Sequence, residues 1–351
     1  MPEHDRHAAM RKIAVVLFNL GGPDRPASVR PFLFNLFNDP AIVGAPSPLR
    51  FLLAKFIAWR RGPKAEAIYA ELGGGSPLLA NTESQARGLE AALASLGRVR
   101  VFIAMRYWHP VSDAAARQVA EFAPDELVLL PLYPQFSTAT TASSRLDWDR
   151  AARRAAIAAP PRTVCCYPGD RGFVRALADL IRPAHARASQ HGRPRVLFSA
   201  HGLPKRVIER GDPYQWQVER TASAVVAALA ANLDWAICYQ SRVGPLEWIG
   251  PSIGDEIERA GRERLPTVVV PIAFVSEHSE TLVELDIEYR RRAARAGVPH
   301  YERVPAVATH PAFIAGLADL VRGALGRAPG ACSGDGARLC PAARTGCAMA
   351  G

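Results

Sequence analysis

Residues 195–204 read RVLFSAHGLP, an apolar run of strand length that ends in histidine, glycine and proline. Residues 17–23 read LFNLGGP and repeat this order, an apolar run followed by glycine and proline. Similar runs recur along the chain, and a helical pattern follows each of them. This alternation predicts βαβ units built around a parallel sheet. Eight strands are expected, at residues 13–20, 99–105, 127–132, 163–166, 195–200, 235–239, 267–273 and 301–305.

The ends of the first three expected strands loosely match, in order, the ends of the fifth, sixth and seventh. Besides the pair quoted above, RYWHP (106–110) matches QSRVGP (240–245), and PLYPQFS (131–137) matches PIAFVSEHSE (271–280). We therefore expect an α/β protein with two similar Rossmann-like lobes, each a doubly wound, parallel four-stranded sheet.

One insertion distinguishes the two halves. Leu17 and Val101 lie 84 residues apart, whereas the corresponding Leu197 and Ile237 lie 40 residues apart. About 44 extra residues, rich in Phe and Leu, thus fall within residues 30–77. Such insertions commonly form a lid or a binding lip. The expected division of the chain is a first lobe at 1–180 that carries the insertion, a second lobe at 181–327 and a Cys-containing extension at 328–351.

The composition is that of a folded globular protein. Of 351 residues, 49% are hydrophobic and 22% are charged, which excludes disordered and collagen-like classes. The net charge is +10, but the longest basic run is Arg290–Arg292, which argues against binding of nucleic acid.

Six cysteines are too few for a disulfide scaffold, and Met1–Lys12 lacks the apolar stretch of a secretory signal. The apolar stretch at 49–59 is shorter than the ~18 residues that span a membrane. We therefore expect the protein to lie in the reducing cytoplasm.

Polar residues follow the expected strands, where a doubly wound sheet forms its ligand crevice. His201 ends one strand, and Glu280, Glu284 and Glu288 come after another and share one face if the segment is helical. Taken alone, His201 could be a loop histidine with a structural hydrogen bond, and the glutamates could be a solvated face. Their common position at the rim favours a site for a divalent cation or for proton removal, with the row of acids as a path to solvent.

Two glycine-rich stretches invite a phosphate-binding interpretation. Neither residues 21–23 (GGP) nor residues 73–77 (GGGSP) match the dinucleotide or P-loop motifs. We expect no nucleotide cofactor.

Seven blocks occur along the chain in a recognisable order, and they are LFNLGGP (17–23), GGGSP (73–77), RYWHP (106–110), PLYPQFS (131–137), SAHGLP (199–204), QSRVGPLEWIGP (240–251) and PIAFVSEHSETLVELDIEY (271–289). Through them the sequence closely resembles the ferrochelatase family, from about residue 13 to about residue 325. The SAHGLP and SEHSETL blocks are the most specific. The resemblance implies two α/β lobes with a porphyrin cleft between them. It also implies an enzyme that inserts Fe²⁺ into protoporphyrin IX, releases two protons and forms haem.

The resemblance assigns roles to individual residues. It implies that His201 faces the centre of the macrocycle, as pyrrole-proton acceptor or iron ligand, with Glu280 as its partner. Which of the two takes the protons and which binds iron stays open. Glu284 and Glu288 resemble an acidic track that carries metal in or protons out. A porphyrin-lining role, with core packing as the alternative, is implied for Leu20, Tyr69, Arg106, Tyr107, Ser137, Trp248 and His278.

The insertion resembles the hydrophobic lip that borders the cleft in this family and can dip into a bilayer. Its large apolar residues, interspersed with Arg50 and Lys55, are typical of an interfacial segment. Arg60 and Arg61 could pair with the two propionates of the porphyrin. We therefore expect a cytoplasmic protein in peripheral contact with membranes, and the resemblance to cluster-bearing relatives also favours a homodimer.

The extension contains Cys332, Cys340 and Cys347, whose spacing fits neither a zinc finger nor the common ferredoxins. Some ferrochelatases hold a [2Fe–2S] cluster with three C-terminal cysteines and one cysteine from the first half. By this resemblance we expect such a cluster here, with Cys166 as the fourth ligand and Cys165 as a nearly equal alternative. Without a cluster the extension would be a floppy tail with incidental thiols, since its small side chains offer little to bury.

Two other functions stay open. A haem or porphyrin carrier on the same fold would need the aromatic pocket but would have no use for the acidic row. An enzyme that inserts another metal, such as Co²⁺, into a related tetrapyrrole would need both, because selectivity among divalent metals depends on geometry.

Overall fold

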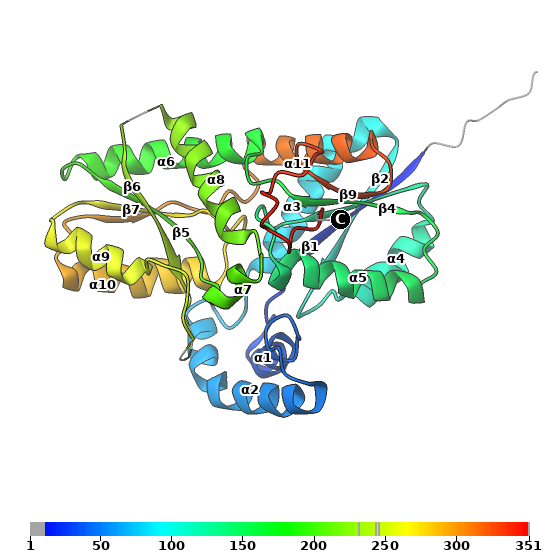
Figure 1. The fold of residues 1–351 in the computed structure, drawn as a ribbon, viewed down its shortest axis with the longest axis horizontal. Helices are drawn as coiled ribbons and strands as arrows, with labels where there is room; N and C mark the ends of the chain where they lie inside the picture. The colour runs from blue at the N-terminus through cyan, green and yellow to red at the C-terminus, as the bar shows by residue number, and fades with distance from the viewer. Residues whose placement is uncertain (1–10, 231, 243, 245, 350–351) are drawn as a thin grey trace, which may run out of the picture.

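Two parallel sheets lie side by side in the computed structural model, with helices packed on their faces (Figure 1). The structure describes residues 11–349 except 231, 243 and 245. Most of the segment Met1–Lys12, two residues of the QSRVGP block and the last two residues of the extension therefore lie outside the described residues.

All eight strands expected from the sequence are present, each within two residues of its expected bounds. They are β1 (Lys12–Asn19), β2 (Arg98–Met105), β3 (Glu126–Pro131), β4 (Pro161–Cys166), β5 (Arg195–His201), β6 (Asp234–Gln240), β7 (Thr267–Pro271) and β8 (Tyr301–Arg303). The first sheet has the order β2-β1-β3-β4-β9, the second has the order β6-β5-β7-β8, and every pair is parallel. The prediction of two similar doubly wound lobes is confirmed.

The first sheet carries a fifth strand that the sequence analysis does not predict. β9 (Gly330–Ser333) lies in the extension and pairs in parallel with the outer edge of β4, so that Val164 is opposite Cys332. Its sequence, GACS, has almost no apolar side chain to give a strand pattern. Backbone hydrogen bonds to an otherwise open sheet edge stabilise this strand, because its side chains offer little hydrophobic burial. The expected four-stranded first sheet is therefore corrected to five strands.

The helices and helical turns are η1 (Pro26–Ser28), α1 (Val29–Phe37), α2 (Ser47–Ala70), α3 (Leu78–Leu93), η2 (Ala94–Leu96), α4 (Ser112–Phe122), η3 (Thr138–Ala142), α5 (Ser143–Arg154), α6 (Arg171–Ser189), α7 (Lys205–Glu209), α8 (Tyr214–Leu229), α9 (Ile253–Arg262), η4 (Glu280–Tyr289), α10 (Arg290–Ala296) and α11 (Pro311–Leu325). Alternate strand residues pack on opposite faces of each sheet. In β5, Val196 and Phe198 join a core that is continuous with the first sheet, whereas Leu197 packs against α9 and α10.

Two helices cross from one sheet to the other. α6 follows β4 of the first sheet but packs against β7 and β8 of the second. α11 follows β8 of the second sheet but packs against β3 and β4 of the first. The two helices also contact each other, and their apolar residues belong to the core that joins both sheets.

The insertion folds as α1 and α2, which pack on each other and project together below the two sheets, after the carboxyl end of β1 (Figure 1). Tyr69, near the end of α2, is buried with Phe32 of α1, and this packing fixes the base of the pair. Among the described residues, no helix is both long and apolar enough to cross a bilayer.

Candidate active site

A histidine and a glutamate meet at the carboxyl end of the second sheet. His201 is the last residue of β5, and Glu280 is the first residue of η4, which follows the neighbouring strand β7. The strand order reverses between β5 and β7, which is where doubly wound sheets bind ligands. Nδ1 of His201 lies 2.8 Å from Oε2 of Glu280. The His201 ring is 38% exposed.

The row of glutamates runs from this pair outward. Ser241, just after β6, bridges the first two acids, with its hydroxyl 3.3 Å from Glu280 and 2.6 Å from Glu284. The backbone N–H of Ser241 and the side-chain amide of Gln240 also donate to Glu284, at 2.9 and 3.1 Å. Glu288 is exposed. The structure thus brings His201, Glu280 and Glu284 together and puts Glu288 at the surface end of the row.

The segment that carries the row is a π-helix over ten residues, not the α-helix that the sequence pattern suggests. π-helices are rare, mostly single-turn, and frequent at functional sites. Their i→i+5 bonds widen the turn, so that side chains four residues apart remain on one side of η4.

The electrostatics of the site follow from burial and close contact. Burial alone would lower the pKa of His201, but the charge and hydrogen bond of Glu280 outweigh it and raise that pKa. Burial opposes the charge of Glu280, yet contact with His201 lowers the pKa of Glu280 to about 2. Burial and the neighbouring Glu280 charge raise the pKa of Glu284. Contact with Glu280 therefore makes the His201 ring a better proton acceptor, beside an acid, Glu284, that also accepts a proton more readily than usual.

Ser241 and Gln240 belong to the site, but the sequence alone does not single out either of them. Ser241 has a left-handed backbone, with φ of 62°, which is uncommon for a residue other than glycine. Such a conformation costs about 1–3 kcal/mol and persists where surrounding contacts fix it, often at functional sites. The available signal is their position at the end of β6, where Gln240 is the last strand residue and Ser241 follows it at the rim of the crevice.

Helix α3, which follows the insertion in the first half, holds the loop that leads to Glu280. The Gln85 amide donates to the carbonyl of Val275 at 2.9 Å and accepts from the hydroxyl of Ser276 at 3.0 Å. Asn81 donates to the carbonyl of Glu277 at 3.0 Å. These bonds fix the acidic loop of the second half against the first.

His278 lies inside this loop and is buried. Its Nδ1 lies 3.1 Å from the carbonyl of Ser276, and its ring packs against Phe274. Burial lowers the pKa of His278, more than nearby Glu280 raises it. Burial therefore disfavours the charged form of His278 beside the acidic row.

The residues expected to line a porphyrin divide into groups. Leu20, Tyr69 and Tyr107 share an apolar cluster at the base of the insertion. Burial raises the pKa of Tyr69 to about 12, and the charge of Glu280 adds to this, so Tyr69 lies near the acidic row. The Tyr107 hydroxyl donates to Asp39 at 2.8 Å, and Tyr107 is 1% exposed.

Arg106, Ser137 and Trp248 occupy three different surroundings. Arg106 is bound to Asp39 at 2.8 Å and to the hydroxyl of Ser143 at 2.7 Å. Ser137 is buried and donates to Asp212 at 3.0 Å. Trp248 pairs with Pro204 and packs over Gly202, where an added Cβ would lie 3.3 Å from the indole ring. Only Trp248 of these three contacts the segment that carries His201.

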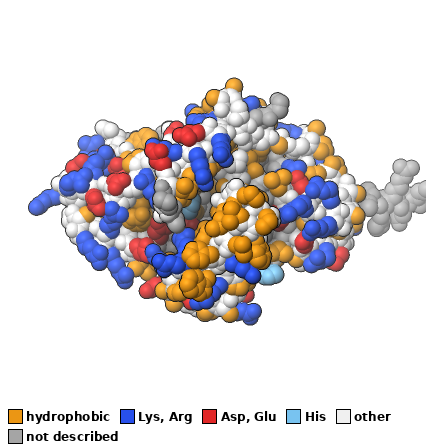
Figure 2. Space-filling view, turned by 60° about the horizontal axis from the view of Figure 1, so that its bottom comes forward, with side chains coloured by type: hydrophobic (Ala, Val, Ile, Leu, Met, Phe, Trp, Pro, Cys, Tyr) orange, Lys and Arg blue, Asp and Glu red, His pale blue; other side chains and the backbone are white. Residues whose placement is uncertain are grey.

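The insertion presents an apolar surface with a basic border. Leu49, Leu52, Phe56 and Trp59 of α2 are all more than half exposed. Figure 2 shows hydrophobic side chains gathered on this part of the molecule, with Lys and Arg side chains beside them. Arg60 is exposed, and Arg61 lies over the Phe37 ring at 5.5 Å from its centroid.

The five cysteines singled out in the sequence are buried near one another. The Sγ atoms of Cys165 and Cys166 lie 3.5 Å apart at the end of β4. Contact with Cys165 and burial raise the pKa of Cys166, and the nearby Cys340 and Cys347 raise it further. Cys332 faces the same strand from β9. Among the described residues, however, no three His, Cys, Asp or Glu are arranged to hold a single metal ion.

Comparisons with known proteins agree with this architecture. The ferrochelatase family model matches residues 12–325. The ferrochelatase of Caulobacter vibrioides (strain NA1000 / CB15N) is 57% identical over 326 residues, which cover 92% of this chain and 93% of the relative. The ferrochelatase of Phenylobacterium zucineum is 55% identical over 340 residues, covering 96% and 98%. Among solved structures, the sirohydrochlorin chelatase SirB from Bacillus subtilis subspecies spizizenii in complex with cobalt has a TM-score of 0.52 at 12% identity, covering 90% of this chain and 95% of that one.

Proposed function

Because the chain belongs to the ferrochelatase family, we propose roles in the family's reaction for the residues around His201. The protein is an enzyme that inserts Fe²⁺ into protoporphyrin IX, which releases two protons and forms protohaem at the end of haem biosynthesis. One observation carries the proposed roles, the 2.8 Å contact between Nδ1 of His201 and Oε2 of Glu280.

In this proposal His201 takes the pyrrole protons through its second ring nitrogen, Nε2. With its Nδ1–H donated to Glu280, the neutral ring keeps a lone pair on Nε2, and the Glu280 carboxylate stabilises the imidazolium that forms. Protons then leave by way of Glu280, the Ser241 hydroxyl and Glu284, each within hydrogen-bond reach of the next. The exposed Glu288, four residues further along η4, is the proposed exit to solvent.

Fe²⁺ is the second substrate and needs nitrogen or oxygen ligands that it can later release. His201, Glu280, Glu284 and Glu288 offer imidazole and carboxylate donors in a row that begins at the surface. The alternative assignment has Nε2 of His201 bind iron, in which case the Glu280 contact orients the ligand ring. Both assignments use the same hydrogen bond.

Anaerobic haem formation from Fe²⁺ and protoporphyrin IX tests the function. We expect His201→Ala to lower kcat by about 10²- to 10⁴-fold, as is typical when a general base is removed. His191→Ala, on an exposed histidine far from Glu280 in the sequence, is the matched control. A folded His201→Ala protein with near wild-type turnover would contradict the assignment. A wild-type protein that binds porphyrin without turnover would be a carrier, and Co²⁺ competition measures metal preference.

We further propose a [2Fe–2S] cluster held by Cys166, Cys332, Cys340 and Cys347, with Cys165 as the alternative to Cys166. Thiols are the donors that such clusters require, and all of these are buried between β4 and the extension. A two-iron cluster needs two thiolates at each iron rather than three ligands around one ion. When bound, it would supply Fe–S bonds that join the extension to the first lobe and add to its folding free energy.

Iron and sulfide analysis of anaerobically purified protein tests the cluster. We expect red-brown protein with visible absorption that Cys340→Ser removes, whereas Cys238→Ser, at a buried thiol inside β6, leaves it unchanged. Separate Cys165→Ser and Cys166→Ser variants decide the fourth ligand. Wild-type protein free of iron and sulfide would exclude the cluster.

The apolar surface of α2 supports a proposed peripheral contact with membranes from the cytoplasmic side. Residues 47–65 contain no acidic residue, and Arg50, Lys55, Arg60 and Arg61 accompany the exposed apolar side chains. Such a segment favours the interface of an anionic bilayer. Arg60 and Arg61 also stay proposed partners of the porphyrin propionates. A homodimer is proposed from the resemblance to cluster-bearing relatives and from the apolar lip, and its test is the mass in solution.

A further inference from the structure

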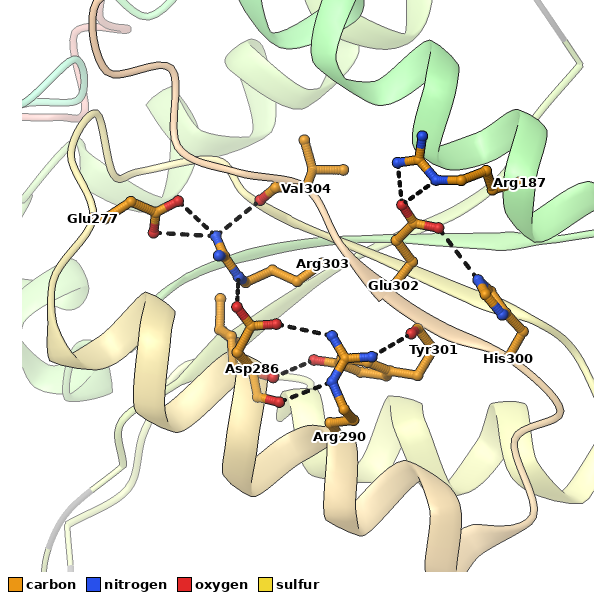
Figure 3. A network of polar contacts seen from close by, with 10 residues as sticks. Arg187, Glu277, Asp286, Arg290, His300, Tyr301, Glu302, Arg303 and Val304 are labelled. Atoms are coloured by element: carbon orange, nitrogen blue, oxygen red, sulfur yellow. Dashed lines mark hydrogen bonds and ion pairs between the residues drawn. The ribbon is translucent and has the colours of Figure 1, made fainter. Parts of the chain in front are cut away.

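One buried arginine, Arg303, has no role in the site described above. It is the last residue of β8, and its side chain is 8% exposed. Its Nη1 donates to both carboxylate oxygens of Glu277, at 2.8 and 3.1 Å, and its Nε donates to Oδ2 of Asp286 at 2.7 Å (Figure 3). A planar guanidinium holds two carboxylates in fixed directions at once, which a lysine ammonium does less well.

The two carboxylates held by Arg303 flank the acidic row in the sequence. Glu277 lies three residues before Glu280, in the loop that enters η4, and Asp286 lies two residues after Glu284, within η4. Glu277 also accepts the backbone N–H of Ala306 at 2.9 Å. Arg303 therefore fastens the entrance of η4 and its middle to the same point, the end of β8.

Further contacts attach the same side of η4 to β8. Arg290 donates to Oδ1 of Asp286 at 2.9 Å and to the carbonyl of Tyr301 at 2.8 Å. The hydroxyl of Tyr301 donates to the carbonyl of Leu285 at 2.7 Å. One side of η4 is thus held to β8 by a connected set of polar contacts, most of which Figure 3 shows.

A π-helix of ten residues needs such support, because isolated π-helical turns are rare and short. Neighbouring like charges destabilise a helix as well, and Glu280 and Glu284 lie four residues apart. A return to i→i+4 bonding would rotate the later residues of η4 around its axis. Glu284 would then turn relative to Glu280, and the distances that Ser241 now keeps to both acids would change.

We propose that Arg303 is a positioning residue for metal insertion, which clamps Glu277 and Asp286 and so holds η4 in the register that brings Glu280 to His201. The inference rests on the proposed roles of His201 and Glu280. Loss of the clamp displaces the acids while the porphyrin contacts of the first lobe stay in place. The effect is therefore expected in kcat and in the KM for Fe²⁺, and not in the KM for porphyrin.

The variants Arg303→Lys, Arg303→Met and Asp286→Asn test this inference, with Glu302→Gln as matched control. Glu302 precedes Arg303 on β8, so its side chain points to the other face of the sheet. There it binds Arg187 of α6 and His300, and it makes no contact with η4 (Figure 3). Thermal melts establish that each variant is folded at the assay temperature, and anaerobic haem formation yields kcat and both KM values.

We expect Arg303→Met to lower kcat by about 10- to 100-fold, the range typical of losing a group that orients a metal-site residue. The KM for porphyrin stays within about two-fold of wild type, as for a mutation that spares porphyrin binding. Arg303→Lys recovers part of the loss. Asp286→Asn removes one held charge without changing shape and gives a smaller loss, so the inference remains testable if Arg303→Met does not fold.

The inference is overturned if folded Arg303→Lys and Asp286→Asn proteins keep wild-type kcat and KM for Fe²⁺. It is also overturned if Glu302→Gln lowers kcat equally, because the role would then be general stability of β8. Failure of the proposed function looks different, since wild-type protein itself would form no haem.

Discussion

The two lobes share one strand order but differ at the place where that order reverses. In the second lobe, the ends of β5 and β7 lead to His201 and Glu280, bound to each other through a 2.8 Å contact. In the first lobe, the end of β1 leads to Leu20, which packs in an apolar cluster with Tyr69 and Tyr107. The same scaffold thus carries titratable groups in one lobe and apolar surface in the other.

This difference matches the two demands of the reaction. A flat, poorly soluble macrocycle is held by apolar and aromatic surface, whereas proton removal and metal delivery need charge. In the proposed roles, the residues at the rim of the first lobe would hold the macrocycle and those at the rim of the second lobe would carry out the reaction, on one duplicated topology.

The largest expected effect tests the reacting side. Glu280→Gln keeps the shape of the side chain but removes the charge that would stabilise an imidazolium at His201. We expect kcat to fall by about 10²-fold or more, with the KM for porphyrin unchanged. Steady-state haem formation at varied porphyrin concentration measures both. Glu288→Gln, at the exposed end of the row, should lower kcat less than Glu280→Gln does. An equal fall in kcat would contradict the expectation that the effect declines with distance from His201.

An intermediate effect tests the binding side. Leu20→Ala removes part of the apolar surface at the end of β1 and should weaken porphyrin binding by about five-fold, or about 1 kcal/mol, with kcat retained. Quenching of porphyrin fluorescence measures the dissociation constant. Leu146→Ala, at an exposed residue of α5, is the control. A fall in kcat without loss of binding would break the division of labour between the lobes.

The smallest effect concerns the bond between the lobes. Asn81→Ala deletes the α3 contact with the carbonyl of Glu277 and should lower the free energy of unfolding by about 0.5 kcal/mol. Chemical denaturation measures it, with Ser84→Ala as a control whose hydroxyl bonds to its own helix. An unchanged free energy of unfolding would mean that the Asn81 contact adds nothing to the Gln85 contacts and the apolar packing that also join the lobes.

The repeated scaffold could be predicted from the sequence because buried parallel strands appear as apolar runs. Eight strands, their grouping and the insertion all follow from that pattern, and the positions of His201 and Glu280 follow from it too. β9 could not be predicted, since edge pairing uses backbone groups that any residue carries. Ser241 and Arg303 act through backbone geometry and a buried ion-pair network, and neither leaves a periodic signal in the sequence.

The exchange of α6 and α11 has a consequence for dissection of the molecule. If the chain were cut between α6 and β5, the first fragment would keep α6 but lose the sheet on which α6 packs, and the second would do the same with α11. Both fragments would therefore expose a hydrophobic face of a sheet. Neither piece should remain in solution by itself, yet the two produced together could recover a nicked enzyme. Although the two halves resemble separate modules, each of them supplies a helix that covers the sheet of the other.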